Sequence, residues 1–292
     1  MGDLLQFSVT GLTIGSIYAI VALGFVTIYS VTKVINLAQG EFVMLGGMIM
    51  FSFVSAGLPY WLSFISTIII VMILGWIMEA TMIQRAKGAD ALSLIILTIG
   101  AAIFIRGIAS MIWGKDQVRV SPFTSNEPID IAGAAITPQS IWIVLIMLLV
   151  VGLLYYLIDR TIVGKAFQAC SVNPIAARLM GISPKKMSSF SFTLSAALGA
   201  LAGLAIAPIM FPAYDMGIML GVKGFSAAIL GGLGSAPGAV LGGVIIGLLE
   251  SFSAGYISSG LKDAIAFSVI LVLLLIRPSG ILGEKNIGKG GL

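Results

Sequence analysis

Histidine is absent from this 292-residue sequence, and cysteine occurs once, at Cys170. Without histidine, the chain lacks the commonest metal ligand and the usual proton carrier near neutral pH. A single cysteine excludes a disulfide within the chain. We therefore expect no metal site and no catalytic residue. A membrane-embedded enzyme is the weakest functional hypothesis, because no activated nucleophile is evident.

Charged residues are also scarce. They make up 10% of the chain, against 59% hydrophobic residues and a mean hydropathy of +1.11, whereas an average soluble protein is about a quarter charged. Residues 141–158 are apolar or aromatic apart from Gly152. As a helix rising about 1.5 Å per residue, they would cross most of a bilayer core of roughly 30 Å. The composition predicts a polytopic, all-α integral membrane protein.

Nine apolar segments divide the chain. The first, from Phe7 onward, is preceded by Asp3 and by no lysine or arginine, so we interpret it as a retained span and not as a signal peptide. We expect one transmembrane domain over residues 1–292, a helical bundle of about eight or nine membrane segments. The segments are 9–30, 34–55, 61–82, 92–112, 141–158, 190–210, 221–233, 236–255 and 264–276.

Basic residues predict the orientation. The loop 160–187 carries five of them. The loop with Arg85 and Lys87 and the C-terminal tail should lie on the same side of the bilayer. With Lys33, the basic residues on that side are then Lys33, Arg85, Lys87, Arg160, Lys165, Arg178, Lys185, Lys186, Arg277, Lys285 and Lys289. The opposite side holds only Lys115, Arg119 and Lys262. Because cytoplasmic loops are enriched in lysine and arginine, we expect loop 160–187 and the C-terminus in the cytoplasm, and the N-terminus and loop 113–139 outside. Loop 113–139 could bind a partner or be an ordinary solvated loop.

Two glycine-rich segments resemble one another. Gly40-Glu41-Phe42 leads to Gly46-Gly47, and Lys223-Gly224-Phe225 leads to Gly231-Gly232. The segment 221–233 spans only about 20 Å as a helix. Because loop 160–187 and the tail are expected on the same side, the chain must cross the bilayer an even number of times between them. Segment 221–233 must therefore complete one of these crossings. It is therefore either a half helix or a full span, and it runs opposite to the first segment.

Paired glycine-broken helices of opposite direction are typical of an inverted repeat around a transport pathway. The alternative is that the glycines only allow close helix packing. For the pathway, the two motifs give Asn36, Gln39, Gly40, Glu41, Gly224, Phe225, Gly231 and Gly232.

Ionisable residues within spans are candidates for function, because a lone charge in hydrocarbon costs several kcal/mol. We favour Glu250 as a buried structural partner of Arg106 over a substrate ligand. Glu79 lies near the cytoplasmic interface, where snorkelling or a pair with Arg85 would explain it.

The loop 160–187 has local helix signals of its own. Asn173 and Pro174 form an N-cap followed by a first helical residue, and Gly181 can adopt the left-handed conformation that ends a helix. A two-turn helix over 174–180 would expose Ile175, Ala176, Ala177, Leu179 and Met180. Its small residues favour a protein groove, although a basic loop lying on anionic lipid is the alternative.

These motifs, taken in order, are similar to those of a known family. The resemblance rests on four groups of segments: 34–42 (VINLAQGEF) with Gly46-Gly47; 164–166 with 173–174, 176–177 and 179–182; 224–225 with 231–235 and 237–239; and 276–278 with Gly280 and Leu282. Over almost its full length, the chain resembles a permease subunit of a bacterial branched-chain amino acid ABC importer of the high-affinity leucine, isoleucine and valine type.

The resemblance implies partners for this chain. It implies a second related permease, two cytoplasmic ATP-binding subunits that hold ATP and magnesium, and an extracytoplasmic binding protein, in a bacterial inner membrane. No nucleic acid and no cofactor of its own are expected. In such systems a cytoplasmic loop contacts the ATPase, which places that role on Gly164, Lys165, Ala166, Asn173, Pro174, Ala176, Ala177, Leu179 and Gly181.

The chain should therefore carry out no bond chemistry. Gly164-Lys165 is followed by Ala166 and does not match the phosphate-binding G-x-x-x-x-G-K-[ST] loop. A nucleotide-independent secondary transporter or channel for small polar solutes is the alternative function. The sequence leaves open which amino acid or small amide is carried and whether the permease pairs with itself.

Overall fold

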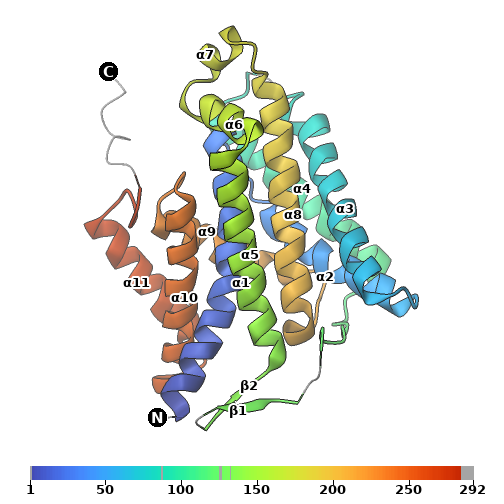
Figure 1. The fold of residues 1–292 in the computed structure, drawn as a ribbon, viewed down its shortest axis with the longest axis vertical. Coiled ribbons are helices and arrows are strands. Elements are labelled where there is room, and N and C mark those ends of the chain that lie inside the picture. Colours follow the sequence, from blue (N-terminus) through green and yellow to red (C-terminus); the bar gives the residue numbers. More distant parts are fainter. Residues whose placement is uncertain (1, 87, 125–126, 132, 284–292) are drawn as a thin grey trace.

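The computed structural model describes residues 2–86, 88–124, 127–131 and 133–283, and within them the chain is an almost entirely helical bundle (Figure 1). A π-helical turn (Glu79–Ile83) extends α3, and strands β1 (Ile129–Ile131) and β2 (Ala134–Ile136) pair as an antiparallel hairpin. The all-α prediction is confirmed. The helices are α1 (Gly2–Thr32), α2 (Gln39–Ser55), α3 (Tyr60–Met78), α4 (Ala91–Trp113), α5 (Pro138–Arg160), α6 (Ile162–Val172), α7 (Pro174–Leu179), α8 (Pro184–Met210), α9 (Met216–Gly231), α10 (Ala236–Tyr256) and α11 (Lys262–Ile276).

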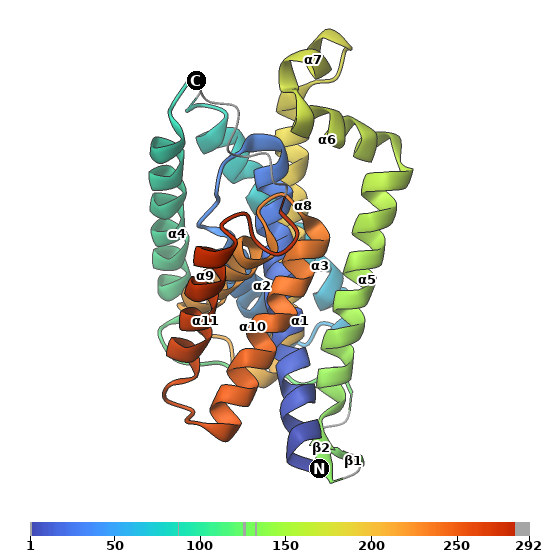
Figure 2. The same cartoon turned by 90° about the vertical axis from the view of Figure 1, so that its left-hand side faces the viewer.

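The bundle has two different ends. Helices α6 and α7 project at one end, and the hairpin lies at the other, beside the first turns of α1 (Figures 1 and 2). There Gln6 donates a hydrogen bond of 3.3 Å to the carbonyl of Ala135. We call these the α6–α7 end and the hairpin end.

Helix α1 occupies the centre of the bundle. Residues 15–28 of α1 are buried, because α5, α8, α9 and α10 all pack against it. The crossing with α10 depends on glycine: a Cβ on Gly15 would lie 2.8 Å from the Cα of Val244, and one on Gly247 would collide with the backbone of Gly15. Small residues that let helix backbones approach closely are the usual packing device in lipid.

Helices α3, α4 and α5 form the outside of the bundle and expose large apolar side chains. Examples are Trp76, Phe104 and Leu149. An apolar belt of this size would promote aggregation in water, whereas the hydrocarbon of a bilayer solvates it. Six helices within the described residues are long and apolar enough to cross a membrane: α1, α3 with its π turn, α4, α5, α8 and α10.

Helices α2 and α9 are shorter and begin inside the bundle. Residues 33–38 join the end of α1, at the α6–α7 end, to α2, and residues 211–215 join the end of α8, at the hairpin end, to α9 (Figures 1 and 2). The backbones of Gly40 and Gly217 are in contact, so the two helices start side by side. Beyond α2, the Tyr60 hydroxyl donates a hydrogen bond to the carbonyl of Ser121, in the segment that leads to the hairpin. Leu233, just after α9, instead lines a pocket together with Ser171 and Val172 of α6. The two helices thus run to opposite ends, as the sequence predicted.

The nine apolar segments all correspond to helices, with shifted boundaries. The segment predicted at 221–233 is α9 (Met216–Gly231), which begins five residues earlier. Its 16 residues reach about 24 Å. Three basic residues of the charge argument, Lys87, Lys285 and Lys289, lie outside the described residues.

Candidate functional site

A sharp turn joins α5 to α6 at the α6–α7 end. The Thr161 hydroxyl accepts a 3.0 Å hydrogen bond from the amide of Gly164 and so caps α6. A side chain on Gly164 would collide with the carbonyls of Leu157 and Ile158, so the turn requires glycine. Phe167 and Cys170 are buried on the same face of α6 as Gly164. Helix α6 therefore lies firmly across the end of the bundle (Figure 2).

Helix α7 is bounded as the sequence predicted. Asn173 Oδ1 accepts hydrogen bonds of 3.0 Å from the amides of Ile175 and Ala176. At the other end, Gly181 has φ +84°, and the Ile182 amide bonds the Ala177 carbonyl at 3.0 Å. This is a Schellman ending, which satisfies carbonyls that the helix leaves free.

The side chains that α6 and α7 point away from the bundle are mostly apolar. Leu179 is 84% exposed, Met180 81% and Ile175 76%, and exposed cationic side chains surround them. Apolar area of this kind, bordered by charge, is typical of a protein-binding surface. We call this surface the α6–α7 patch; it comprises Ile162, Val172, Ile175, Leu179 and Met180, with Lys165, Arg178, Lys185 and Lys186 around them.

Not all nine residues predicted to contact the ATPase are exposed. Lys165, Asn173, Pro174, Ala176, Leu179 and Gly181 are exposed, and Ala166 is half-buried. Gly164 and Ala177 are buried, so the prediction that Ala177 is exposed was wrong. Ala177 faces inward because the short helix must rest one side on its neighbours. Its methyl group positions α7 rather than offering a surface.

Polar contacts hold the non-helical segment that leads to α2. Thr98 Oγ1 accepts from the Leu37 amide at 3.2 Å, and Asn36 Oδ1 accepts from the Ala38 amide at 3.1 Å. Gln39 Nε2 donates to the Ser195 carbonyl of α8 at 3.0 Å. Irregular backbone within a bilayer is stable only where protein groups satisfy it in this way.

An ion pair joins α4 to the start of α2. Arg106 donates from Nη2 and Nε to Glu41 Oε1, at 2.5 and 3.2 Å. The prediction that Arg106 pairs with Glu250 was wrong, because α4 packs beside α2 and not beside α10. Within the described part of the chain, Glu41 Oε2 and Asn36 Nδ2 are buried without a hydrogen-bond partner.

The four pathway candidates of the second motif lie on and just after α9. Gly224 packs on Val21 of α1, and Gly231 packs on Gly238 of α10. The ring of Phe225 lies 5.4 Å from that of Phe25. Gly232, with φ +108°, ends the helix. The structure thus brings the first motif together around Gly40 and spreads the second along α9, where its glycines form tight helix contacts.

A second ionic cluster joins α1, α9, α10 and α11. Lys223 Nζ lies 2.9 Å from Glu250 Oε1 and 2.8 Å from Asp263 Oδ1, and the Tyr18 hydroxyl donates to Glu250 Oε2 at 2.8 Å. Lys223 and Glu250 are only 5% and 6% exposed. Sequence reasoning overlooked this cluster, although the apolar segment 221–233 contains a single lysine, Lys223, and the segment 236–255 a single acid, Glu250.

Glu79 is fully buried in the π-helical turn after α3. Its carboxylate accepts hydrogen bonds from Ser188 at 2.8 Å and from Ser189 and Gln84 at 2.6 Å each. The expected snorkelling or pairing with Arg85 was therefore wrong. The π turn directs Glu79 at the first turns of α8 instead, where it ties α3 to the helix that follows α7.

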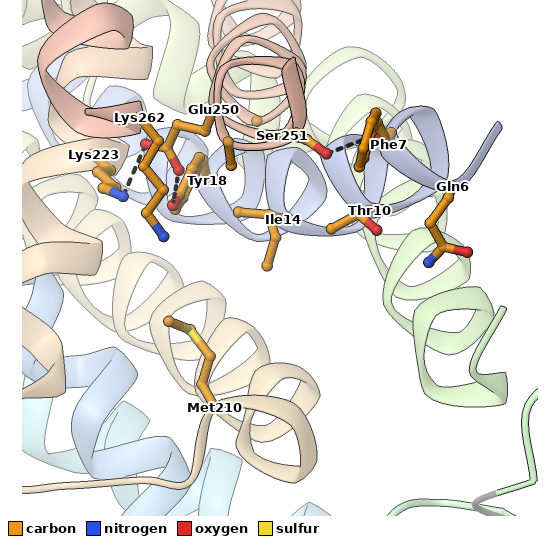
Figure 3. Close-up of a pocket in the computed structure, with 13 residues that line it drawn as sticks. Gln6, Phe7, Thr10, Ile14, Tyr18, Met210, Lys223, Glu250, Ser251 and Lys262 are labelled. Carbon is orange, nitrogen blue, oxygen red and sulfur yellow. Dashed lines mark hydrogen bonds and ion pairs between the residues drawn. The ribbon is translucent and has the colours of Figure 1, made fainter. Parts of the chain in front are cut away.

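Two adjoining cavities lie along the half of α1 near the hairpin. One, of about 340 Å³, lies between α1 and α10 and reaches Tyr18, Lys223 and Glu250 (Figure 3). The other, of about 300 Å³, lies between α1 and the ends of α5 and α8. Gln6, Thr10 and Ile14 line both. None of the eight predicted pathway residues, all of which are described, lines either cavity.

Comparison with known proteins identifies similar chains over the full length. The family described as "Branched-chain amino acid transport system / permease component" matches residues 7–276. The high-affinity branched-chain amino acid transport system permease protein LivH of Salmonella typhimurium is 32% identical, over 98% of this chain and 97% of LivH. BraD of Pseudomonas aeruginosa, with the same description, is 32% identical over 98% and 97%.

More distant similarities extend to another permease and to a solved structure. The ribose import permease protein RbsC of Haemophilus influenzae is 27% identical, over 93% of this chain and 84% of RbsC. The structure of PsaBC from Streptococcus pneumoniae in complex with Fab aligns with a TM-score of 0.52 at 13% identity, over 96% of this chain and 93% of that chain. This last likeness concerns the fold alone.

Proposed function

Because the chain belongs to the branched-chain amino acid permease family, we propose that it is the membrane-spanning subunit of an ATP-driven importer of branched-chain amino acids. ATP and magnesium would bind to two separate cytoplasmic subunits, and this chain would alternate between outward-open and inward-open states. A second related permease would complete the membrane part. An extracytoplasmic binding protein would deliver the amino acid.

The α6–α7 patch is the observation that carries this proposal. An ATPase subunit that drives transport must bind the permease on a surface that is rigid and that extends beyond the bilayer. Helix α6 is held on the bundle by Phe167 and Cys170, and α7 is fixed by caps at both ends. A push on the patch would therefore pass into α5 and α8, the two long helices that flank it, as a rigid-body motion.

Orientation follows from assigning the patch to the ATPase. The α6–α7 end then faces the cytoplasm, and the hairpin end and the N-terminus face outward, in the inner membrane of a bacterium. This arrangement puts the exposed Lys165, Arg178, Lys185 and Lys186 on the inside, as the positive-inside rule favours. Loop 113–139, which contains the hairpin, would then be the surface available to the binding protein.

We propose that the non-helical segment 33–38 and the first residues of α2 form part of the transport pathway. Asn36 and Glu41 each keep one buried polar atom without a partner in the described residues. Buried polar groups are seldom left unpaired without a reason. A passing polar solute would satisfy such atoms briefly and then release them. This supports the role proposed for the first motif, together with Gln39 and Gly40 beside it.

Leu179→Asp tests the proposed function. A carboxylate at this exposed site would have to lose its water on binding a partner, which costs several kcal/mol when no opposite charge meets it. We expect at least a tenfold loss of ATPase subunits copurified with the permease, and a matching loss of ATP-dependent leucine uptake. The measurement is made on the complex coexpressed in bacterial membranes.

Ile129→Asp is the matched control, because it places the same charge on an exposed apolar residue at the hairpin end. This variant should retain the ATPase subunits. Normal copurification by Leu179→Asp would reject the α6–α7 patch as the ATPase contact. Leucine uptake that continues without any ATPase subunit would favour the secondary transporter or channel.

A further inference from the structure

From the cavity between α1 and α10, we infer a contact site for a zwitterion, at which the amino acid exchanges partners with the buried Lys223–Glu250 pair. The inference rests on the proposed function, since it concerns the substrate of that transport. Apart from Lys223, which begins the second glycine motif, the residues concerned lie outside both motifs. We call this space the outer cavity.

The outer cavity connects the hairpin end with the interior of the bundle. It runs along α1 from Gln6 to Tyr18, a distance of about 18 Å along a helix. Its volume of about 340 Å³ falls within the usual range for small-molecule sites. Figure 3 shows the cluster of Tyr18, Lys223 and Glu250 at one end of the cavity and Gln6 at the other.

The lining combines buried charge with apolar surface. Lys223 and Glu250 supply an ammonium group and a carboxylate within 2.9 Å of each other. Ile14 and Met210 line the same cavity and offer an apolar surface to an aliphatic side chain. A few convergent polar groups on an otherwise apolar wall are typical of a site that orients a small ligand.

Charge balance favours a zwitterion over other ligands. Lys223 binds two carboxylates, those of Glu250 and Asp263, so a substrate ammonium group can replace Lys223 on one of them. The substrate carboxylate can then accept from the Lys223 ammonium that has been released. Every charge keeps a partner throughout this exchange, which avoids the large cost of an unpaired charge in a low-dielectric interior. Lys262 also lines the cavity, so two lysines, Lys223 and Lys262, balance the carboxylates of Glu250 and Asp263. A zwitterion keeps this charge balance, whereas a ligand with a single net charge would disturb it.

Tyr18 fixes the geometry of the exchange. Its hydroxyl donates to Glu250 Oε2 at 2.8 Å, and its ring lies 5.5 Å from Lys223 Nζ. Glu250 Oε2 is therefore held in place while Oε1 exchanges partners. Tyr18 acts as a positioning residue here, because its hydrogen bond holds the Glu250 carboxylate in place.

Substrate protection tests the site directly. Thr10, which lines the outer cavity, is changed to cysteine in a chain whose Cys170 is replaced by alanine, within the assembled transporter. We expect 10 mM leucine to slow labelling by a charged methanethiosulfonate at least fivefold. Leucinamide, a cation, and isocaproate, an anion, should each protect less than twofold. No protection by leucine, or equal protection by isocaproate, would overturn the inference.

Two variants extend the test to transport. Lys223→Met with Glu250→Gln removes both charges together, because losing one alone would leave the other unpaired and endanger folding. Met210→Trp fills the cavity and leaves the ion pair untouched. Both should lower ATP-dependent leucine uptake at least tenfold per assembled complex. Met111→Trp, on an exposed face of α4, is the matched control and should transport normally.

Different outcomes would reject the proposed function and the zwitterion site. If the unaltered complex shows no ATP-dependent leucine uptake, the proposed function is wrong. If the unaltered complex transports and both the double variant and Met210→Trp transport equally well, only the zwitterion site is wrong.

Discussion

Individual charged residues in this bundle are placed with their partners on neighbouring helices. Arg106 on α4 reaches Glu41 on α2, and Lys223 on α9 reaches Glu250 on α10. Each of these pairs therefore joins two neighbouring helices. Removing one member would strand the other charge, whereas removing both would not.

Arg106 should contribute to stability by pairing with the buried Glu41. Arg106→Met should lower the free energy of unfolding by about 3 kcal/mol, because Glu41 loses its cation while buried. Adding Glu41→Gln should recover most of the loss. The measurement is a double-mutant cycle from denaturant unfolding of purified permease in detergent. Equal losses for the single and double variants would show that the two side chains stabilise the protein by packing and not by charge compensation.

Cys170 gives a prediction for pH. Burial raises the pKa of its thiol above the ordinary value of 9.0, and only the thiolate reacts readily. Alkylation by N-ethylmaleimide should therefore be slow at pH 7 and still rising above pH 9. Val172→Cys in a Cys170→Ala chain places an exposed thiol on the same helix and should react at least tenfold faster at pH 7. Equal rates would contradict the buried position of Cys170.

At the scale of elements, the contact between the first turns of α2 and α9 depends on glycine. Two helices that enter from opposite ends can begin side by side only if neither carries a side chain at the crossing. Gly40 and Gly217 satisfy this condition, each as the second residue of its helix. The consequence is a pair of helix N-termini facing one another within the bundle.

Gly40→Ala tests this contact. Its Cβ would collide with the carbonyl of Gly217, so we expect a loss of about 2 kcal/mol in the free energy of unfolding from overpacking. Gly100→Ala is the control: the space beside Gly100 on α4 is open, and alanine favours a helix over glycine. Thermal unfolding in detergent should show a lowered midpoint only for Gly40→Ala.

For the whole molecule, the sequence was sufficient to predict what depends on local pattern. Apolar runs predicted the helices, and Asn173 with Gly181 predicted the bounds of α7, because caps are set by neighbouring residues. The partners of Glu250 and Glu79 could not be predicted, since they depend on which helices lie side by side. The burial of Ala177 could not be predicted for the same reason. Alanine is small and apolar, so its side chain fits equally well on the inward or the outward face of α7.

The central place of α1 bears on the order in which the bundle is made. This helix is synthesised before α8, α9 and α10, yet those later helices cover most of its surface. Until they arrive, its threonines, serines and glycines face lipid or whatever holds the growing chain at the insertion machinery. The helix that ends up most enclosed is therefore among the first to enter the membrane, and the fold closes around it only when the last third of the chain has been inserted.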